Sequence, residues 1–246
     1  RSYTRVPVED RGTLREEREE MIDFFDFFVR FLPELLKGTG MTLLLTAEGL
    51  AAGFILGMAA TLARTYGNKF WRTVAIVYIE IFRGTPLLVQ LFLIYYGLPG
   101  VGITLSRELS AFLALGLNSG AYQAEYLRGS ILAIGEGQMM AGRAIGLSKW
   151  KTIFTIILPQ ALRLAIPAWS NEPVSLLKST AVVFLISVPE LMAKAKGIAA
   201  KTYDPISSYL AVAIIYLVIV YVLDAILKWG ERSTRIPGFE MEGKKA

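Results

Sequence analysis

The sequence predicts an all-α membrane protein with several membrane-spanning helices. Of its 246 residues, 54% are hydrophobic and 19% are charged, and the mean hydropathy is +0.47, whereas a soluble domain has typically about 25% charged residues. The apolar excess lies in runs of roughly 20 residues, the length that a helix needs to cross a bilayer. The absence of Cys and His from the sequence excludes a disulfide-stabilised scaffold, His/Cys zinc sites and Ser-His-Asp catalysis. The net charge of +5 does not indicate nucleic-acid binding, because basic residues of membrane chains usually mark cytoplasmic loops.

Two segments precede the first span. Residues 1–23 are charged and form either a solvated segment or the beginning of a helix. Residues 24–38 carry phenylalanines at near-helical spacing, with Asp26 and Arg30 between them. This pattern predicts an amphipathic helix lying in the membrane interface, and the alternative is a helix that packs on another protein surface.

One transmembrane domain is expected over residues 39–230, followed by a cytoplasmic tail over residues 231–246. Its five spans are predicted over residues 41–63, 73–96, 109–127, 166–187 and 206–227. In the first span Gly49, Gly53 and Gly57 repeat every four residues, which predicts the close approach of another helix.

Lys and Arg residues predict the orientation of the chain. The connection between the first and second spans, the connection between the third and fourth spans and the C-terminal tail lie on one side of the membrane. Together they carry thirteen Lys and Arg, whereas the two connections on the other side carry four. Since basic loops stay in the cytoplasm, this distribution favours an N-terminus outside and a C-terminus inside.

The fourth span carries a one-sided polar stripe. At about 100° per residue, five of its side chains share an arc of about 120°. They are Asn171, Glu172, Ser175, Lys178 and Ser179. Polar groups inside a span usually face a bundle interior or a cavity, so this stripe is a candidate solute pathway. The alternative is a structural helix in which Glu172 and Lys178 pair with its neighbours.

Other spans contribute further candidate pathway residues. Asn118 and Tyr122 share one arc of the third span with Ser119 and Glu125. In the second span the segment 83–86 breaks the helical pattern, and Gln90 follows in an otherwise apolar stretch.

A long loop over residues 129–165 is too polar to span and too regular to be a linker. Met140, Ala144 and Leu147 fall on one helical stripe, and Gly146 allows a sharp change of direction. The loop therefore predicts two short helices joined at Gly146, which form a rigid knob able to fit a groove on a cytosolic partner.

The second of these helices is expected over residues 149–157. It should end before Leu158, and Pro159 should open the next helix, where its missing N–H costs little.

Several sequence blocks resemble the permeases of bacterial and archaeal ABC importers. Ala141, Gly146 and Leu158-Pro159 match the coupling loop of that family in spacing. The polar amino-acid branch is matched by further blocks at residues 83–99 (RGTPLLVQLFLIYYGLP), 119–131, 146–172 and 176–180. The resemblance covers about residues 31–228. Two positions depart from the family pattern: Met140 stands in place of Glu, and Gly142 in place of Ala.

The resemblance implies a five-span type I permease core in the cell membrane of a prokaryote. It implies a transport subunit without enzyme activity or a cofactor of its own, which translocates a polar amino acid. The implied partners are two cytosolic ABC ATPase subunits carrying ATP and Mg²⁺, a second permease subunit forming a homodimer or a related heterodimer, and an extracytoplasmic solute-binding protein.

The resemblance also implies a role for the loop, whose coupling residues contact the ATPase. They are Met140, Ala141, Gly142, Arg143, Gly146, Leu147 and Pro159. The alternative function is a stand-alone ion-coupled carrier or channel for a small polar solute, in which the hinged loop would have no purpose. A membrane-embedded enzyme is disfavoured, because no tight catalytic cluster is apparent.

Overall fold

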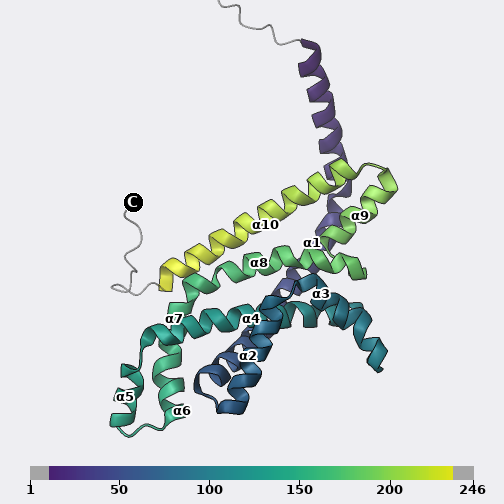
Figure 1. Cartoon of the computed structure of the whole chain (residues 1–246). Helices are drawn as coiled ribbons and strands as arrows, with labels where there is room; N and C mark the ends of the chain where they lie inside the picture. Colours follow the sequence, from purple (N-terminus) through teal and green to yellow (C-terminus); the bar gives the residue numbers. More distant parts are fainter. Residues whose placement is uncertain (1–10, 235–246) are drawn as a thin grey trace, which may run out of the picture.

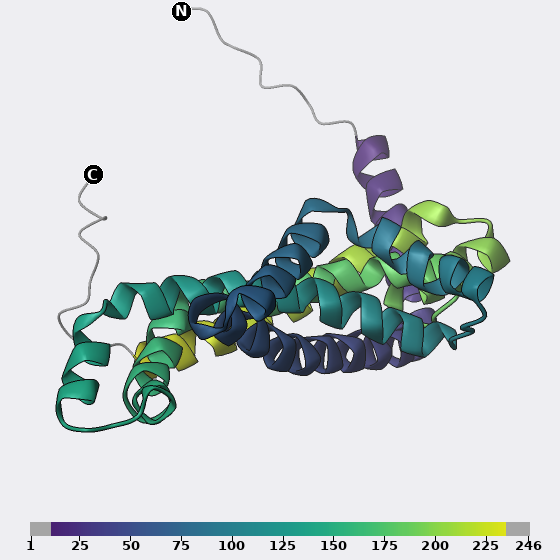
Figure 2. The same cartoon turned by 60° about the horizontal axis from the view of Figure 1, so that its bottom comes forward.

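The computed structural model describes residues 11–234, with side chains described for residues 23–232. Every regular element within this range is helical, as the sequence predicts. The longer helices run side by side along one axis of the molecule, and a pair of short helices projects from one end (Figures 1 and 2). Residues 1–10 of the predicted charged segment and residues 235–246 of the predicted tail lie outside the described residues.

The first helix, α1 (Arg11–Tyr66), is one continuous helix of 56 residues. The sequence predicts a separate amphipathic helix over residues 24–38, but the structure joins that segment to the first span, and Pro33 does not end the helix. Four of its phenylalanines pack against an apolar cluster built by Leu35, α9 (Leu191–Thr202) and α10 (Pro205–Thr234). The apolar face of this segment therefore meets other helices of the same chain.

The glycine repeat of α1 packs against α4 (Arg107–Ile134). A Cβ atom added to Gly53 would lie 3.0 Å from the backbone nitrogen of Gly120, and one added to Gly57 would lie 2.9 Å from the Gly120 carbonyl oxygen. At such separations the backbones touch, which confirms the predicted close helix approach.

The second predicted span is a sharply bent pair of helices. It consists of α2 (Lys69–Gly84), α3 (Leu87–Phe92), a π-helical turn η1 (Leu93–Gly97) and a 3₁₀ turn η2 (Leu98–Val101). The axis bends by 108° between Gly84 and Leu87, where Pro86 forms the N-cap of α3. The predicted break after Arg83 is therefore confirmed.

The knob consists of α5 (Gly137–Ala144) and α6 (Lys149–Thr152), and the chain turns between them at Gly146, whose φ is +85°. This positive φ confirms Gly146 as the point where the direction changes. Pro159 stands at the first positions of α7, as predicted. The second helix, however, does not end before Leu158, so that part of the prediction is wrong. It continues through the π-helical turn η3 (Ile153–Ile157) into α7 (Leu158–Trp169).

The π-helical turn explains how Pro159 is accommodated. The backbone N–H of Leu158 donates to the Ile153 carbonyl, five residues earlier. A wider turn relieves the clash of the proline ring with the preceding turn, so the helix continues where an α-helix would break.

The fourth predicted span is also interrupted. Ser170 separates α7 from α8 (Asn171–Ser179), which tightens into the 3₁₀ helix η4 (Thr180–Ile186). After Ser187, whose φ is +63°, the chain continues into α9 at an angle of 50°.

Length and apolar composition identify three described helices as able to cross a membrane, and up to five spans if each bent pair counts as one. The three are Asp23–Tyr66, Lys149–Trp169 and Pro205–Arg232. The second of these includes residues 149–165, so the prediction that the whole loop 129–165 is too polar to span is wrong for its second half. The predicted third span, within α4, does not meet this criterion. Its polar side chains make it less apolar than the other spans. α4 can carry them because it packs against α1, α2, α7 and α8, which bury side chains such as Ser119 and Gln123 against protein.

Candidate functional site

Glu172 lies inside the helix bundle. Its side chain is only 4% exposed, and its Oε1 accepts a hydrogen bond from Ser119 Oγ at 2.7 Å. Gln123 donates to the same Ser119 oxygen at 3.0 Å and accepts from Trp169 Nε1 at 2.7 Å. The carboxylate thus ends a chain of hydrogen bonds that joins α8 to α4 and α7.

The polar stripe of α8 is split between two surfaces. Asn171, Ser175 and Lys178 are exposed, Ser179 is half-buried, and Glu172 is turned inward. Within the described residues Glu172 and Lys178 form no ion pair. These two residues stand at opposite edges of an arc of about 120°, so the packing of α8 can bury one and expose the other.

Gln90 and Asn118 meet at the bend between α2 and α3. Gln90 is buried, and its Nε2 donates to the carbonyl oxygens of Phe82 at 2.8 Å and of Thr85 at 3.0 Å. Asn118 Nδ2 donates to Gln90 Oε1 at 3.0 Å and to the Phe82 carbonyl at 3.2 Å. The last turn of a helix leaves carbonyls without partners, and these two amides satisfy them here. Both amides therefore stabilise the bend.

Tyr122 lies one turn beyond Asn118 on α4 and is half-buried. The guanidinium of Arg83 stands over its ring, 5.5 Å from the centroid. The residues that the sequence predicts for a pathway in the second and third spans are thus gathered around the end of α2.

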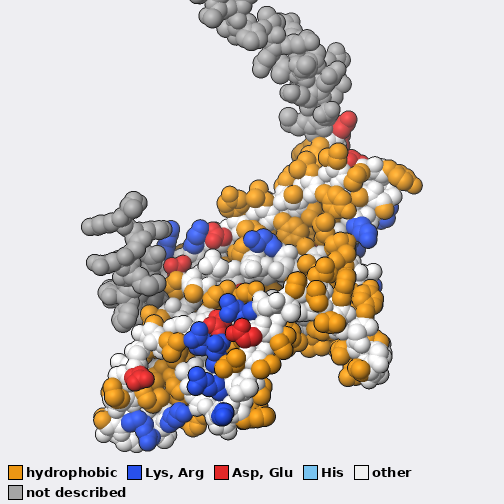
Figure 3. Space-filling view, in the orientation of Figure 1, with side chains coloured by type: hydrophobic (Ala, Val, Ile, Leu, Met, Phe, Trp, Pro, Cys, Tyr) orange, Lys and Arg blue, Asp and Glu red, His pale blue; other side chains and the backbone are white. Residues whose placement is uncertain are grey.

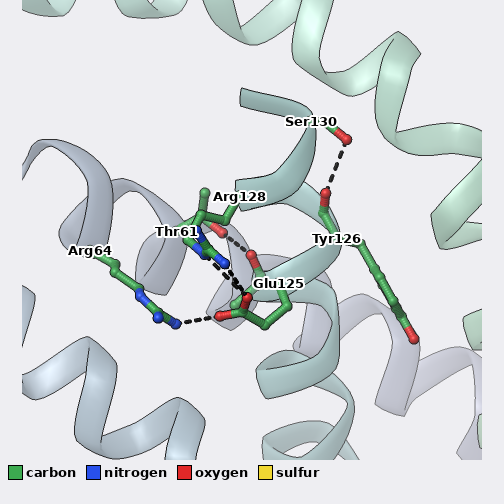
Figure 4. A network of polar contacts seen from close by, with 7 residues as sticks. Thr61, Arg64, Glu125, Tyr126, Arg128 and Ser130 are labelled. Carbon is green, nitrogen blue, oxygen red and sulfur yellow. Dashed lines mark hydrogen bonds and ion pairs between the residues drawn. The ribbon is translucent and has the colours of Figure 1, made fainter. Parts of the chain in front are cut away.

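A cluster of charged side chains ties α1 to α4 (Figure 4). Glu125 forms ion pairs with Arg64 and, at 2.7 Å, with Arg128. Thr61 Oγ1 donates to the Ala124 carbonyl at 2.8 Å beside them. Acidic and basic side chains gather over α2 and α4, within a largely hydrophobic face (Figure 3).

The knob exposes three large apolar side chains, of which Trp150 on α6 is 49% exposed. Met140 is 65% and Ile145 is 75% exposed, and Ala141 and Gly146 are also exposed. Leu147 is half-buried, and its carbonyl accepts from Arg143 Nη1 at 3.0 Å. Arg143 therefore stabilises the turn at Gly146.

The two helices of the knob are held together at Gly142, which is buried. A Cβ atom at this position would lie 2.4 Å from Thr152 Cγ2 and 2.8 Å from Thr152 Oγ1. Only glycine permits this separation of α5 and α6. Pro159 is exposed, but it lies on α7 and is not part of the knob. Gln123, Trp169 and Thr152 carry structural contacts that sequence reasoning did not assign, and Ser119, which it only grouped with Asn118 and Tyr122, carries another.

A metal site is not evident in the described part of the chain, where no three Asp or Glu side chains are close enough to hold an ion.

Comparisons with known proteins agree with this architecture. The family described as binding-protein-dependent transport system inner membrane component matches residues 49–236. The glutamine transport system permease protein of Escherichia coli K12 is 40% identical over 207 residues, which cover 83% of this chain and 94% of that protein. The L-cystine transport system permease protein of Bacillus subtilis 168 is 43% identical over 197 residues, covering 80% and 84% of the two chains.

The fold is matched by the crystal structure of an amino acid ABC transporter with histidines. The TM-score is 0.79 at 36% sequence identity, over 85% of this chain and 98% of that one. Because the family match spans most of the chain and relatives of about 40% identity cover nearly their whole length, the chain belongs to the family of binding-protein-dependent transport system inner membrane components.

Proposed function

We propose that this chain is the permease subunit of an ATP-driven importer for a polar amino acid. The observation that carries the proposal is the knob formed by α5 and α6. It projects from the bundle, it exposes Met140 and Ile145, and it is stiffened at Gly142 and Arg143. A stiff apolar projection can transmit the movement of a partner into which it fits. The relatives that transport glutamine and L-cystine support an amino acid as the solute.

The partners follow from the same proposal. Two ATPase subunits bind the knobs of two permease chains, which are either copies or relatives of one another, and they supply the ATP and Mg²⁺ chemistry. A solute-binding protein delivers the amino acid on the opposite side of the membrane, where the N-terminus lies. The C-terminal tail is then cytoplasmic, as the distribution of Lys and Arg predicts.

The exposed side of α8 is the proposed solute-facing surface. Lys178 offers a cation for the carboxylate of an amino acid, and Asn171 and Ser175 offer hydrogen-bonding groups on the same face. Ser179 lies half-buried on the same helix. Tyr122 on α4 remains a predicted pathway residue. Glu172 is the candidate partner of a solute ammonium only if α8 turns; in the present arrangement its bond to Ser119 fixes the rotation of the helix. Gln90 and Asn118 hold the neighbouring bend.

The test of the knob is a pair of aspartate substitutions. Ile145→Asp places a charge on the exposed apolar tip, and Ile103→Asp places one on a similarly exposed isoleucine between η2 and α4. The wild-type chain and the Ile103→Asp variant should co-purify with an ATPase subunit and import amino acid, whereas Ile145→Asp should lose both properties. Import by the purified chain with no ATPase subunit would establish a stand-alone carrier and refute the proposal.

The test of the solute-facing surface is Lys178→Gln. Loss of a charged hydrogen bond should raise the amino-acid concentration for half-maximal uptake by about tenfold. Lys196→Gln, on an exposed lysine of α9, is the matched control and should leave uptake unchanged. Equal uptake curves for the two variants would remove Lys178 from the solute site.

A further inference from the structure

A hollow of about 740 Å³ lies beside the knob, between the end of α1, the start of α2 and the first turns of α6 and η3. Its walls are mostly apolar. Tyr66, Trp71, Trp150 and Phe154 contribute four aromatic rings, and Lys149 contributes a cation. Ligand sites of this size typically combine an apolar lining with a few polar groups.

The hollow lies where three helices reach the boundary of the membrane. One candidate span ends at Tyr66, the bent pair begins at Lys69, and another candidate span begins at Lys149. Trp and Tyr are enriched at this boundary because each ring has an apolar body and a polar end. We take these helix ends as the membrane boundary, which places the hollow at the depth of lipid headgroups, on the face that carries the knob.

The charge around the hollow has one sign. Residues 62–72 and 146–157, which contribute its walls, contain no Asp or Glu, and they carry Arg64, Lys69, Arg72 and Lys151 as well as Lys149, of which only Lys149 lines the hollow. The ammonium of Lys149 donates to the Tyr66 carbonyl at 2.8 Å and stands 5.9 Å from the centroid of the Trp150 ring. This cation is held in place at the edge of the apolar wall.

We propose that this hollow binds one acidic phospholipid. Its phosphate lies near Lys149, and an acyl chain lies against Trp71, Trp150 and Phe154. A soluble anion would leave the aromatic wall in water, and a neutral apolar ligand would leave the basic charge unmatched. An amphiphile with an anionic head matches both features, and clustered basic residues near a membrane attract acidic lipids.

The position of the site gives it a consequence for transport. Lys149 and Trp150 open α6, directly after the turn that joins it to α5. A lipid held by these residues fixes the first turn of α6, and hence the knob, relative to the ends of α1 and α2. Binding of the lipid itself does not depend on the proposed function; only this consequence for coupling does.

The test uses lipids with brominated acyl chains, because bromine quenches tryptophan fluorescence on contact. The full chain is placed in lipid nanodiscs, with and without its ATPase partner. Each series contains brominated phosphatidylglycerol or brominated phosphatidylcholine at equal mole fractions. The double variant, Trp71→Phe with Trp150→Phe, removes the two fluorophores of the hollow but keeps aromatic walls. The sequence has four tryptophans, so subtracting the fluorescence of this variant from that of the wild type gives the signal of Trp71 and Trp150 alone.

Half-maximal quenching of this signal should need about fivefold less brominated phosphatidylglycerol than phosphatidylcholine, since one lysine near the surface contributes about this factor. Lys149→Gln should bring the two curves together, and Lys149→Arg should keep them apart. Lys151→Gln removes the same charge from a lysine of the same helical turn that does not line the hollow, so this matched control should also keep them apart.

Two results would overturn the proposal. Identical curves for the two lipids in the wild type would show a surface without preference for acidic headgroups. Loss of quenching when the ATPase partner is bound would show that a protein, rather than a lipid, covers the hollow. Neither result would affect the co-purification test of the knob, so the two proposals fail separately.

Discussion

Ser119 and Glu172 join two helices at a point that is closed to solvent. The hydroxyl of Ser119 on α4 donates to the carboxylate of Glu172 on α8 at 2.7 Å, and both side chains are buried. The bond sets the rotation of α8 and therefore decides that Asn171, Ser175 and Lys178 are the exposed residues of that helix.

Ser119→Ala should lower the free energy of unfolding by about 1 kcal/mol, because the buried carboxylate loses a donor. Glu172→Gln keeps an accepting oxygen and the volume of the side chain, so its effect should be smaller, and Glu172→Ala should have the largest effect. Thermal unfolding of the purified protein in detergent measures the series. The exposed Ser175→Ala is the control, and equal melting temperatures for all four variants would contradict a stabilising role for the bond.

Gly142→Ala restores the residue of the family pattern and should still impair this chain. The new Cβ would lie 2.4 Å from Thr152 Cγ2, so α5 must move away from α6. Overpacking of this kind costs about 1–3 kcal/mol. We expect normal insertion of the variant but loss of amino-acid-stimulated ATP hydrolysis in the assembled complex.

Thr152→Ala removes both atoms that would meet the new methyl group within 3 Å. The double variant, Gly142→Ala with Thr152→Ala, should therefore recover much of the stimulated hydrolysis that Gly142→Ala loses. Failure of this rescue would show that position 142 acts through something other than its distance from Thr152.

Gly53→Ala should loosen the contact between α1 and α4. Its Cβ would lie 2.9 Å from Ser119 Oγ and 3.0 Å from the Gly120 nitrogen, and backbone atoms cannot give way easily. Gly40→Ala is the matched control on the same helix, because a Cβ there meets nothing within 4 Å. Thermal unfolding should show a lower melting temperature for Gly53→Ala alone; an equal decrease for Gly40→Ala would point to helix flexibility instead of packing.

Gln90→Glu should weaken the bend between α2 and α3. The change replaces the donating Nε2 by an oxygen that faces the carbonyls of Phe82 and Thr85, so both carbonyls lose the Gln90 donor and Phe82 keeps only Asn118. A loss of at least about 1 kcal/mol of stability is expected. Gln138→Glu makes the same chemical change on an exposed residue of α5 and should be neutral. Equal stability of the two variants would show that Gln90 does not hold the bend.

Features set by neighbouring residues were predictable from the sequence. The glycine repeat of α1 and the turn at Gly146 depend on small residues at fixed spacing, and the structure has both. The break before Pro86 depends on a proline that cannot continue the preceding helix, and it too is present. The family resemblance predicted the function class, and the family match agrees with it.

Features set by distant residues were not predictable in the same way. The phenylalanines of residues 24–38 have an apolar face, but only the folded chain shows that α9 and α10 cover it. An arc on a helical wheel groups Glu172 with Lys178, but the packing of α4 on α8 decides which of them is buried. Pro159 continues a helix because a π-helical turn precedes it, and that turn has no clear signal in the sequence. Gln123 carried a weaker signal, since it lies one helical turn after Ser119 on the same face.

The length of α1 has a mechanical consequence for the whole subunit. This helix contributes Leu45, Leu35 and Ala60 to three separate apolar clusters, and Leu62 and Tyr66 pack on a fourth. Because these four apolar clusters share one long helix, they cannot shift relative to one another unless α1 bends. A push delivered at the end near Tyr66 should therefore pivot all four clusters together, so that the subunit tilts as one piece.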